Sequence, residues 1–155
     1  MVTAIPIDFD SFDADLAEMM TAPAAAAAPR LPGDLSITTT SVQPGRLTCE
    51  LPVTEELLNP LGAAHGGVVS ALVEHVFGAV CLPVVPRGSW PATLEYKVNF
   101  LAPARVGIMV AEATIVSMSK RTAVVRVDVV NDGRPVCAAQ GAVAIMAPRS
   151  DATPA

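Results

Sequence analysis

The chain has 155 residues and a mass of 16.0 kDa, which fits one domain built around a single core. Apolar residues make up 52% of the sequence and charged residues 16%, a composition that excludes an intrinsically disordered chain. Ten basic and fifteen acidic residues give a formal net charge of −5, so the sequence offers no broad basic surface for nucleic-acid phosphates, and we expect no nucleic-acid partner.

The cysteines Cys49, Cys81 and Cys137 are odd in number and show no C-x-x-C spacing. We therefore predict buried, reduced thiols rather than a disulfide framework or a zinc site. No basic residue precedes Arg30, so no secretory signal is visible, and we expect a cytoplasmic protein.

The N-terminal part of the chain predicts a helix followed by a loop. Residues 8–20 place apolar side chains at three- and four-residue spacing, and Asp8 or Asp10 is available as the N-cap. Residues 21–33 are rich in alanine and proline and indicate a linker or surface loop. The sequence thus divides into an N-terminal helix and linker (1–34), a main domain (35–147) and a flexible tail (148–155).

Alternating and β-rich runs predict the strands of the main domain. Pro44-Gly45 is a typical turn between two such runs, and Asp132-Gly133 favours a tight hairpin between the last two. The predicted strands cover residues 35–42, 46–53, 93–101, 106–117, 122–131 and 136–146. In the third of them we expect Leu94, Tyr96, Val98 and Phe100 on the buried face, and Thr93, Glu95, Lys97 and Asn99 on the other.

The segment between the first hairpin and the later strands is apolar enough to raise the question of a membrane span. His65, Glu74 and His75 interrupt it and Pro83 ends it, so we interpret it as a buried helix over residues 68–80 of a protein without a membrane span. A helix this apolar must be wrapped by other elements. The order of elements predicts an α+β domain whose antiparallel sheet covers one central helix.

Glu74 is the first candidate for chemistry. A carboxylate within an apolar helix is unfavourable to bury in its charged form, and such a group is a candidate base or nucleophile. The alternative is that Ser70, Glu74 and Gly78, which share one side of the helix, form a stripe that faces solvent.

The loop before the helix is the second candidate. Gly66 and Gly67 open the helix and leave its first backbone N–H groups available to an anionic or carbonyl oxygen. Gly66 and Glu74 are separated by about 12 Å along a straight helix, too far to act on one carbonyl within one subunit. A dimer with antiparallel helices would bring Gly66 of one chain to Glu74 of the other. In the same loop, Asn59 and His65 are either structural residues or orienting groups.

Other reaction classes find no support. The sequence has no G-x-S-x-G elbow for a serine hydrolase and no glycine-rich phosphate loop. His65 and His75 are not at a helical chelate spacing, so we expect no metal.

Residues 59–74, N-P-L-G-A-A-H-G-G-V-V-S-A-L-V-E, are followed from residue 93 by T-L-E-Y-K-V-N-F-L-A-P-A. Together they resemble the hotdog-fold acyl-CoA thioesterases of the PaaI-like and 4-hydroxybenzoyl-CoA type, and the similarity covers about residues 35–146. The resemblance implies a curved antiparallel sheet around one long helix. It also implies a homodimer joined through the sheets, with dimers that pair into a homotetramer.

Carried over by motif position, the resemblance implies that Glu74 attacks the thioester carbonyl or activates water, while Gly66 of the other subunit donates its N–H to the carbonyl oxygen. Asn59 would place the water or the carboxylate, His65 would orient the loop, and the Thr93 hydroxyl would assist the water. No separate cofactor is implied, because coenzyme A is part of the substrate.

The substrate would be held by Gly67 at the helix start and by basic residues that meet the coenzyme A phosphates, namely Arg105, Lys120 and Arg121. The last two also fit a solvated hairpin end. The alternative to a thioesterase is a hotdog domain that binds acyl-CoA without turning it over. A hotdog dehydratase is disfavoured, because those enzymes space their histidine and acidic residues differently.

Overall fold

The computed structural model describes residues 7–23 and 30–148. Its helices are α1 (Ala14–Thr21), α2 (Leu31–Asp34) and α3 (Gly66–Ala79), with short 3-10 turns at η2 (Glu55–Leu57) and η3 (Leu82–Val84). Its strands are β1 (Thr38–Gln43), β2 (Arg46–Val53), β3 (Trp90–Phe100), β4 (Gly107–Met118), β5 (Thr122–Asn131) and β6 (Arg134–Met146).

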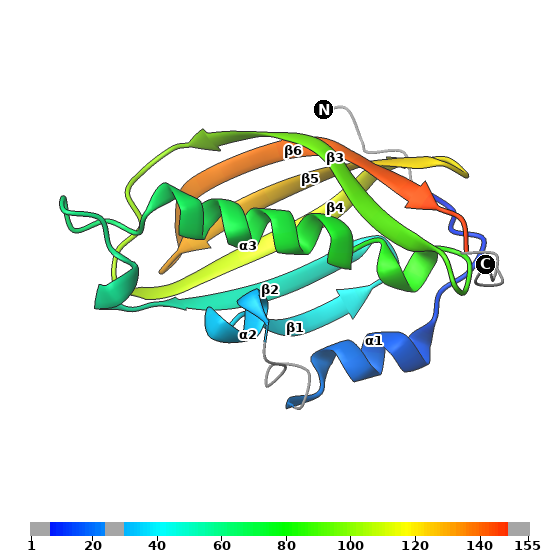
Figure 1. The fold of residues 1–155 in the computed structure, drawn as a ribbon, viewed down its shortest axis with the longest axis horizontal. Coiled ribbons are helices and arrows are strands. Elements are labelled where there is room, and N and C mark those ends of the chain that lie inside the picture. Colours follow the sequence, from blue (N-terminus) through cyan, green and yellow to red (C-terminus); the bar gives the residue numbers. More distant parts are fainter. Residues whose placement is uncertain (1–6, 24–29, 149–155) are drawn as a thin grey trace, which may run out of the picture.

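The strands form one antiparallel sheet in the order β1-β2-β4-β5-β6-β3, which curves around α3 (Figure 1). The inner side of α3 packs into the concave face of the sheet, where Leu72, Val73, Val76 and Phe77 are fully buried. The expected α+β domain with one wrapped central helix is confirmed.

The apolar run that raised the question of a membrane span is this core helix. Residues 66–84 are long and apolar enough to cross a membrane by length and composition alone. More than half of that stretch is buried inside the fold, because the sheet surrounds it. Burial in the core therefore accounts for its hydrophobicity.

Both predicted turns are present. Pro44 and Gly45 connect β1 to β2, and Gly45 has a φ of 69°. Asp132 and Gly133 connect β5 to β6 with φ values of 49° and 79°, the two positive values that a type I′ hairpin requires. The predicted bounds of β5 are those observed.

The N-terminal helix begins later than predicted. Asp13, rather than Asp8 or Asp10, is its N-cap, and its Oδ1 accepts a hydrogen bond from the Leu16 N–H at 3.0 Å. The loop predicted over residues 21–33 contains the start of α2, because Pro32 occupies a first-turn position that proline tolerates. The rest of that loop, residues 24–29, and the predicted tail from residue 149 lie outside the described residues.

The alternation predicted along β3 is broken by a bulge. The register with β6 shifts between Thr93 and Glu95, and the strand lies at the edge of the sheet. As a result Leu94, which we expected to be buried, is 61% exposed. Phe100 keeps its predicted direction toward the start of α3, but it lies at the end of the strand and is 58% exposed rather than buried. The bulge also directs the Thr93 side chain toward α3 rather than to the polar face.

The cysteines Cys49, Cys81 and Cys137 are free and buried, as predicted. Burial raises the pKa of the Cys49 thiol to about 11 and that of Cys81 to about 12. Burial, together with the nearby charge of Asp128, raises the pKa of Cys137 to about 11.

Gly141 on β6 faces the β3 bulge, and we expect its replacement to destabilise the fold. A Cβ added there would clash with the carbonyl oxygen of Glu95 and would lie 2.5 Å from the Tyr96 Cβ. Both atoms belong to β3, whose pairing with β6 limits how far its backbone can move away. Gly141→Ala should lower the free energy of unfolding by about 1–3 kcal/mol. Urea denaturation measures the change, with Ala142→Gly on the same strand as a control for altered β propensity. A Gly141→Ala protein as stable as the wild type would contradict this close packing.

Candidate active site

Glu74 lies on the outer side of α3, facing β3, and is exposed in the single chain. The Thr93 hydroxyl donates a hydrogen bond to Glu74 Oε1 at 3.2 Å. The β3 bulge makes this contact possible, because it turns Thr93 toward the helix. Glu74 is therefore not buried within the single subunit, as the solvent-facing alternative expects, whereas Ser70 and Gly78 of the same stripe are half-buried.

The stripe that contains Glu74 runs along β3. A Cβ on Gly66 would lie 3.3 Å from the Phe100 ring, and one on Gly78 would lie 4.0 Å from Pro91. The first residue of α3 thus lies beside the end of β3, and the last turn of α3 lies beside its start. The helix and this edge strand run antiparallel, with the carboxylate between them.

His75 follows Glu74 on the opposite flank of the helix and is half-buried. Its burial lowers the pKa of its imidazole, and the neighbouring Glu74 charge acts in the other direction without reversing the shift. The ring is therefore neutral at pH 7.

The start of α3 is capped by His65, which is exposed. Its Nδ1 accepts a hydrogen bond from the Gly67 N–H at 3.0 Å, and its carbonyl oxygen accepts one from the Val68 N–H at 2.8 Å. The Gly67 amide, predicted to bind substrate, is thus engaged by His65. Within residues 7–23 and 30–148, no acceptor contacts the Gly66 N–H. The free donor at this helix start is the Gly66 amide.

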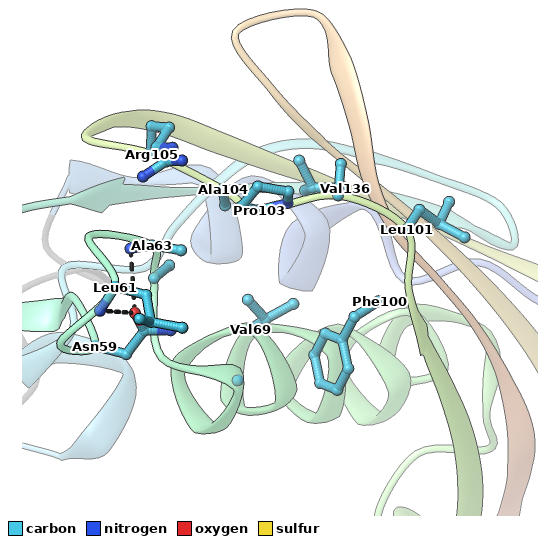
Figure 2. Close-up of a pocket in the computed structure, with 13 residues that line it drawn as sticks. Asn59, Leu61, Ala63, Val69, Phe100, Leu101, Pro103, Ala104, Arg105 and Val136 are labelled. Carbon is cyan, nitrogen blue, oxygen red and sulfur yellow. Dashed lines mark hydrogen bonds between the residues drawn. The ribbon is translucent and has the colours of Figure 1, made fainter.

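Asn59 shapes the loop that precedes the helix. Its Oδ1 accepts hydrogen bonds from the Leu61 N–H at 2.8 Å and the Ala63 N–H at 3.3 Å, drawn as dashed lines in Figure 2. Its own backbone N–H donates to the Ala63 carbonyl oxygen at 2.7 Å. Asn59 therefore orders the loop, and among the described residues its side-chain NH2 group donates no hydrogen bond.

A cavity of about 560 Å³ opens between this loop, the start of α3 and the end of β3 (Figure 2). Gly66 and Asn59 line it together with apolar side chains that include Val69, Phe100 and Val136. Arg105 lies at its upper rim in Figure 2. The cavity combines apolar walls with one free amide donor and one cation.

Arg105 is held in place from two sides. Its guanidinium donates to the Gly62 carbonyl oxygen, and its backbone N–H donates to Asn131 Oδ1 at 2.7 Å. Asn131 is only 6% exposed, and its Nδ2 also donates to the Ile108 carbonyl oxygen. We did not single out Asn131 from the sequence. The available signal was its position, because it is a polar residue at the end of a β-rich run, just before the Asp132-Gly133 turn.

The predicted phosphate-binding residues do not lie together in one chain. Arg105 precedes β4, whereas Lys120 and Arg121 follow it, at the other end of a strand of 12 residues. Lys120 lines a separate cavity with Val84 and Pro86, beyond the C-terminal end of α3. In the part of the chain that the structure describes, no group of three or more His, Cys, Asp or Glu side chains could hold a metal ion.

A curved antiparallel sheet wrapped around one long helix is the hotdog fold. The PaaI protein from the phenylacetic acid degradation operon of E. coli has this fold, with a TM-score of 0.75, 23% identity and coverage of 84% of this chain and 94% of that chain. The family model of the thioesterase superfamily matches residues 61–138, and the chain belongs to this superfamily.

Two curated relatives are similar over most of the domain. Human acyl-coenzyme A thioesterase 13 is 31% identical over 106 residues, which make up 68% of this chain and 75% of that protein. The 1,4-dihydroxy-2-naphthoyl-CoA hydrolase of Listeria monocytogenes is 29% identical over 98 residues, 63% of this chain and 80% of that protein. The expected hotdog fold and thioester-hydrolase class are confirmed. The roles of the individual site residues stay predictions.

Proposed function

We propose that the protein hydrolyses an acyl-CoA thioester to a free acid and coenzyme A, at a site that two subunits of a homodimer share. The observation that carries this proposal is the placement of the free Gly66 N–H and the Glu74 carboxylate on one continuous helix. Their separation of about 12 Å along the axis exceeds the reach of one carbonyl group. One carbonyl group could therefore contact both only if one subunit supplied the Gly66 N–H and a second subunit supplied the Glu74 carboxylate.

The edge strand β3 supports such a pairing. Its outer edge has no neighbouring strand within the described residues, and it carries the exposed side chains of Leu94 and Phe100. Unpaired strand edges readily pair with an identical edge about a two-fold axis. Since α3 runs alongside β3, this pairing would set the two helices antiparallel and bring Gly66 toward Glu74 of the partner subunit.

In this arrangement the Gly66 N–H polarises the thioester carbonyl and stabilises the charge that develops on its oxygen. Glu74 of the partner subunit can remove a proton from a water that attacks the carbonyl carbon, so that the CoA thiolate leaves and the free acid forms directly. Alternatively Glu74 attacks the carbonyl carbon itself, the CoA thiolate leaves, and water then hydrolyses the acyl–Glu74 anhydride to the free acid. Thr93 orients the carboxylate through its hydrogen bond to Oε1. His65 and Asn59 keep the loop and the helix start in the conformation that exposes the Gly66 amide.

The same symmetry gives coenzyme A a basic path. In each subunit Arg105 lies near the N-terminal end of α3, whereas Lys120 and Arg121 lie beyond its C-terminal end. Antiparallel helices would therefore place Arg105 near Lys120 and Arg121 of the partner subunit. The pantetheine arm would occupy the cavity beside Gly66, with its phosphates toward these cations.

Subunit complementation tests the shared site. Glu74→Gln and Gly66→Pro each disable a different half of the site, so co-expressed subunits with separate affinity tags should recover activity in mixed dimers. About half of random dimers are mixed and each holds one intact site, so about a quarter of the wild-type rate should return.

Release of free thiol is measured on a panel of short to long aliphatic, phenylacetyl and hydroxybenzoyl CoA thioesters. A wild-type protein that hydrolyses none of them would overturn the proposed function. An active wild type whose mixed dimers stay inactive would instead place each site within one subunit.

A further inference from the structure

Two opposite charges lie close together on the edge strand β3. Glu95 and Lys97 are two residues apart beyond the bulge, so they project from the same face of the sheet, and both are exposed. Tyr96, between them, projects to the other face, where its ring stacks on Phe77 with 5.3 Å between the ring centroids. Within the part of the chain that the structure describes, neither Glu95 nor Lys97 forms an ion pair. Both charges are therefore available to a group beyond the edge of the sheet.

The backbone of β3 also presents hydrogen-bonding groups at this edge. The Leu101 N–H donates to the Val136 carbonyl oxygen at 2.9 Å, so the odd-numbered residues of this stretch direct their backbone groups toward β6. Because these groups alternate along a strand, Tyr96 and Val98 direct theirs away from the sheet. An identical strand can therefore pair antiparallel with β3 through these residues.

The shared active site specifies where the two-fold axis crosses this strand. If Gly66 of one subunit lies opposite Glu74 of the other, the axis passes midway between these two residues along α3. In each subunit Gly66 lies beside Phe100, and Glu74 accepts a hydrogen bond from Thr93. The axis therefore crosses β3 midway between Thr93 and Phe100, which is the position of the two charges.

The two charges then select one register. In an antiparallel pair, residues directly opposite each other project from the same face, so a two-fold axis passes through a residue rather than between two. An axis through Glu95 or through Lys97 would set two like charges opposite each other, which is unfavourable. An axis through Tyr96 sets each Glu95 opposite Lys97 of the partner subunit. Of these three registers, only the one centred on Tyr96 forms two ion pairs.

We infer that Glu95 and Lys97 are positioning residues that hold the β3 strands of two subunits in the register centred on Tyr96. The inference rests on the proposed function, since it specifies how the two halves of the shared site are aligned. A slip to the next allowed register moves one strand past the other by two residues, about 7 Å. Reacting groups must lie within about 3–3.5 Å of each other, so a slipped dimer would separate the Gly66 N–H from the partner's Glu74.

Disulfide trapping tests the register directly. In the register centred on Tyr96, residues 95 and 97 form a pair without backbone hydrogen bonds, whose Cα atoms lie about 4.5 Å apart, within the range of a disulfide. Differently tagged Glu95→Cys and Lys97→Cys chains are co-expressed, and we expect a disulfide between the two kinds of chain and none in either variant alone. The native cysteines are buried and should give little background. A disulfide in one variant alone, or none in the mixture, would overturn the inference.

Charge reversal tests what holds the register. Glu95→Lys leaves two positive charges at this edge and Lys97→Glu leaves two negative ones, so each variant alone should dimerise about tenfold or more weakly than the wild type. A mixture of the two chains restores both opposite-charge pairs, so dimerisation and thioester hydrolysis should return toward wild-type values. Sedimentation equilibrium and release of CoA measure the two recoveries.

Asp128→Lys and Arg126→Glu are matched controls. They reverse an ion pair with the same two-residue spacing on β5, which lies two strands away from the edge. Alone or mixed, they should dimerise and hydrolyse acyl-CoA as the wild type does.

Recovery in the mixture of the β3 variants, without an effect in the controls, would support the inference. Unchanged dimerisation of both β3 variants, or no recovery on mixing, would overturn it, while complementation between Glu74→Gln and Gly66→Pro chains would preserve the proposed function. If charge reversal prevents folding, the cysteine variants decide the register alone. A wild type inactive on every CoA thioester would overturn the proposed function, and the disulfide pattern would still decide the register, because it does not depend on activity.

Discussion

Replacing Glu74 by glutamine should reduce kcat for acyl-CoA hydrolysis by about 10²–10⁴-fold, the range that a positioned general base or nucleophile supplies. Glutamine keeps the length of the side chain and an oxygen that can accept the Thr93 hydrogen bond, so only the negative charge is removed. Steady-state release of CoA measures the loss. Because Glu74 is exposed in the single chain, we expect the melting temperature of the Glu74→Gln protein to stay close to that of the wild type.

Glu112→Gln is a matched control, because this residue is exposed on β4 and makes only a long 3.9 Å ion pair with Arg46. It should hydrolyse acyl-CoA at the wild-type rate. A Glu74→Gln protein that retains more than about a tenth of the wild-type kcat would remove Glu74 from the reaction. If activity is lost as expected, rapid mixing of the wild type separates the two chemical roles. A burst of CoA ahead of free acid indicates a covalent intermediate on Glu74, whereas simultaneous release indicates a general base.

The second large effect should come from removing one hydrogen atom at the start of α3. Gly66→Pro deletes the N–H donor at the first position of the helix, where proline is tolerated. The preceding residue, His65, already has φ and ψ of −59° and 136°, which a following proline requires. We expect kcat to fall by about 10²–10³-fold, as for the loss of one oxyanion donor.

Gly66→Ala is the control that isolates this N–H. Both substitutions add a Cβ about 3.3 Å from the Phe100 ring, but alanine keeps the donor. The ratio of the two kcat values therefore reports the replacement of the N–H by the proline ring carbon, whereas any effect that they share reports crowding against Phe100. Equal activities of Gly66→Pro and Gly66→Ala would show that this amide does not stabilise the transition state.

The fold could be predicted because local signals and burial agreed along most of the chain. The apolar helix, the Asp132-Gly133 turn and the β-rich runs all specified the same arrangement. Prediction failed where one tertiary contact decided between similar local choices. Asp8, Asp10 and Asp13 are all suitable N-caps, and the contacts of Asp13 with Pro83 and Arg87 select the last of them.

The candidate site was predicted less completely, because its geometry depends on side-chain direction. Alternation placed Thr93 on the polar face of its strand, and only the bulge at Leu94 turns it toward Glu74. Likewise, two glycines at a helix start look equivalent in sequence, yet His65 occupies the Gly67 amide and leaves that of Gly66 free. Neither the bulge nor this cap leaves a periodic signal in the residues themselves.

The burial of Cys49, Cys81 and Cys137 makes the enzyme well suited to a continuous colorimetric assay. A chromogenic disulfide reagent reacts with thiolates, and these side chains are both inaccessible and, with pKa values of about 11 to 12, almost fully protonated at neutral pH. The native protein should therefore contribute almost no background colour, and it should not be inactivated by the reagent. Turnover can then be followed at high enzyme concentration, where slow substrates and weakened variants remain measurable.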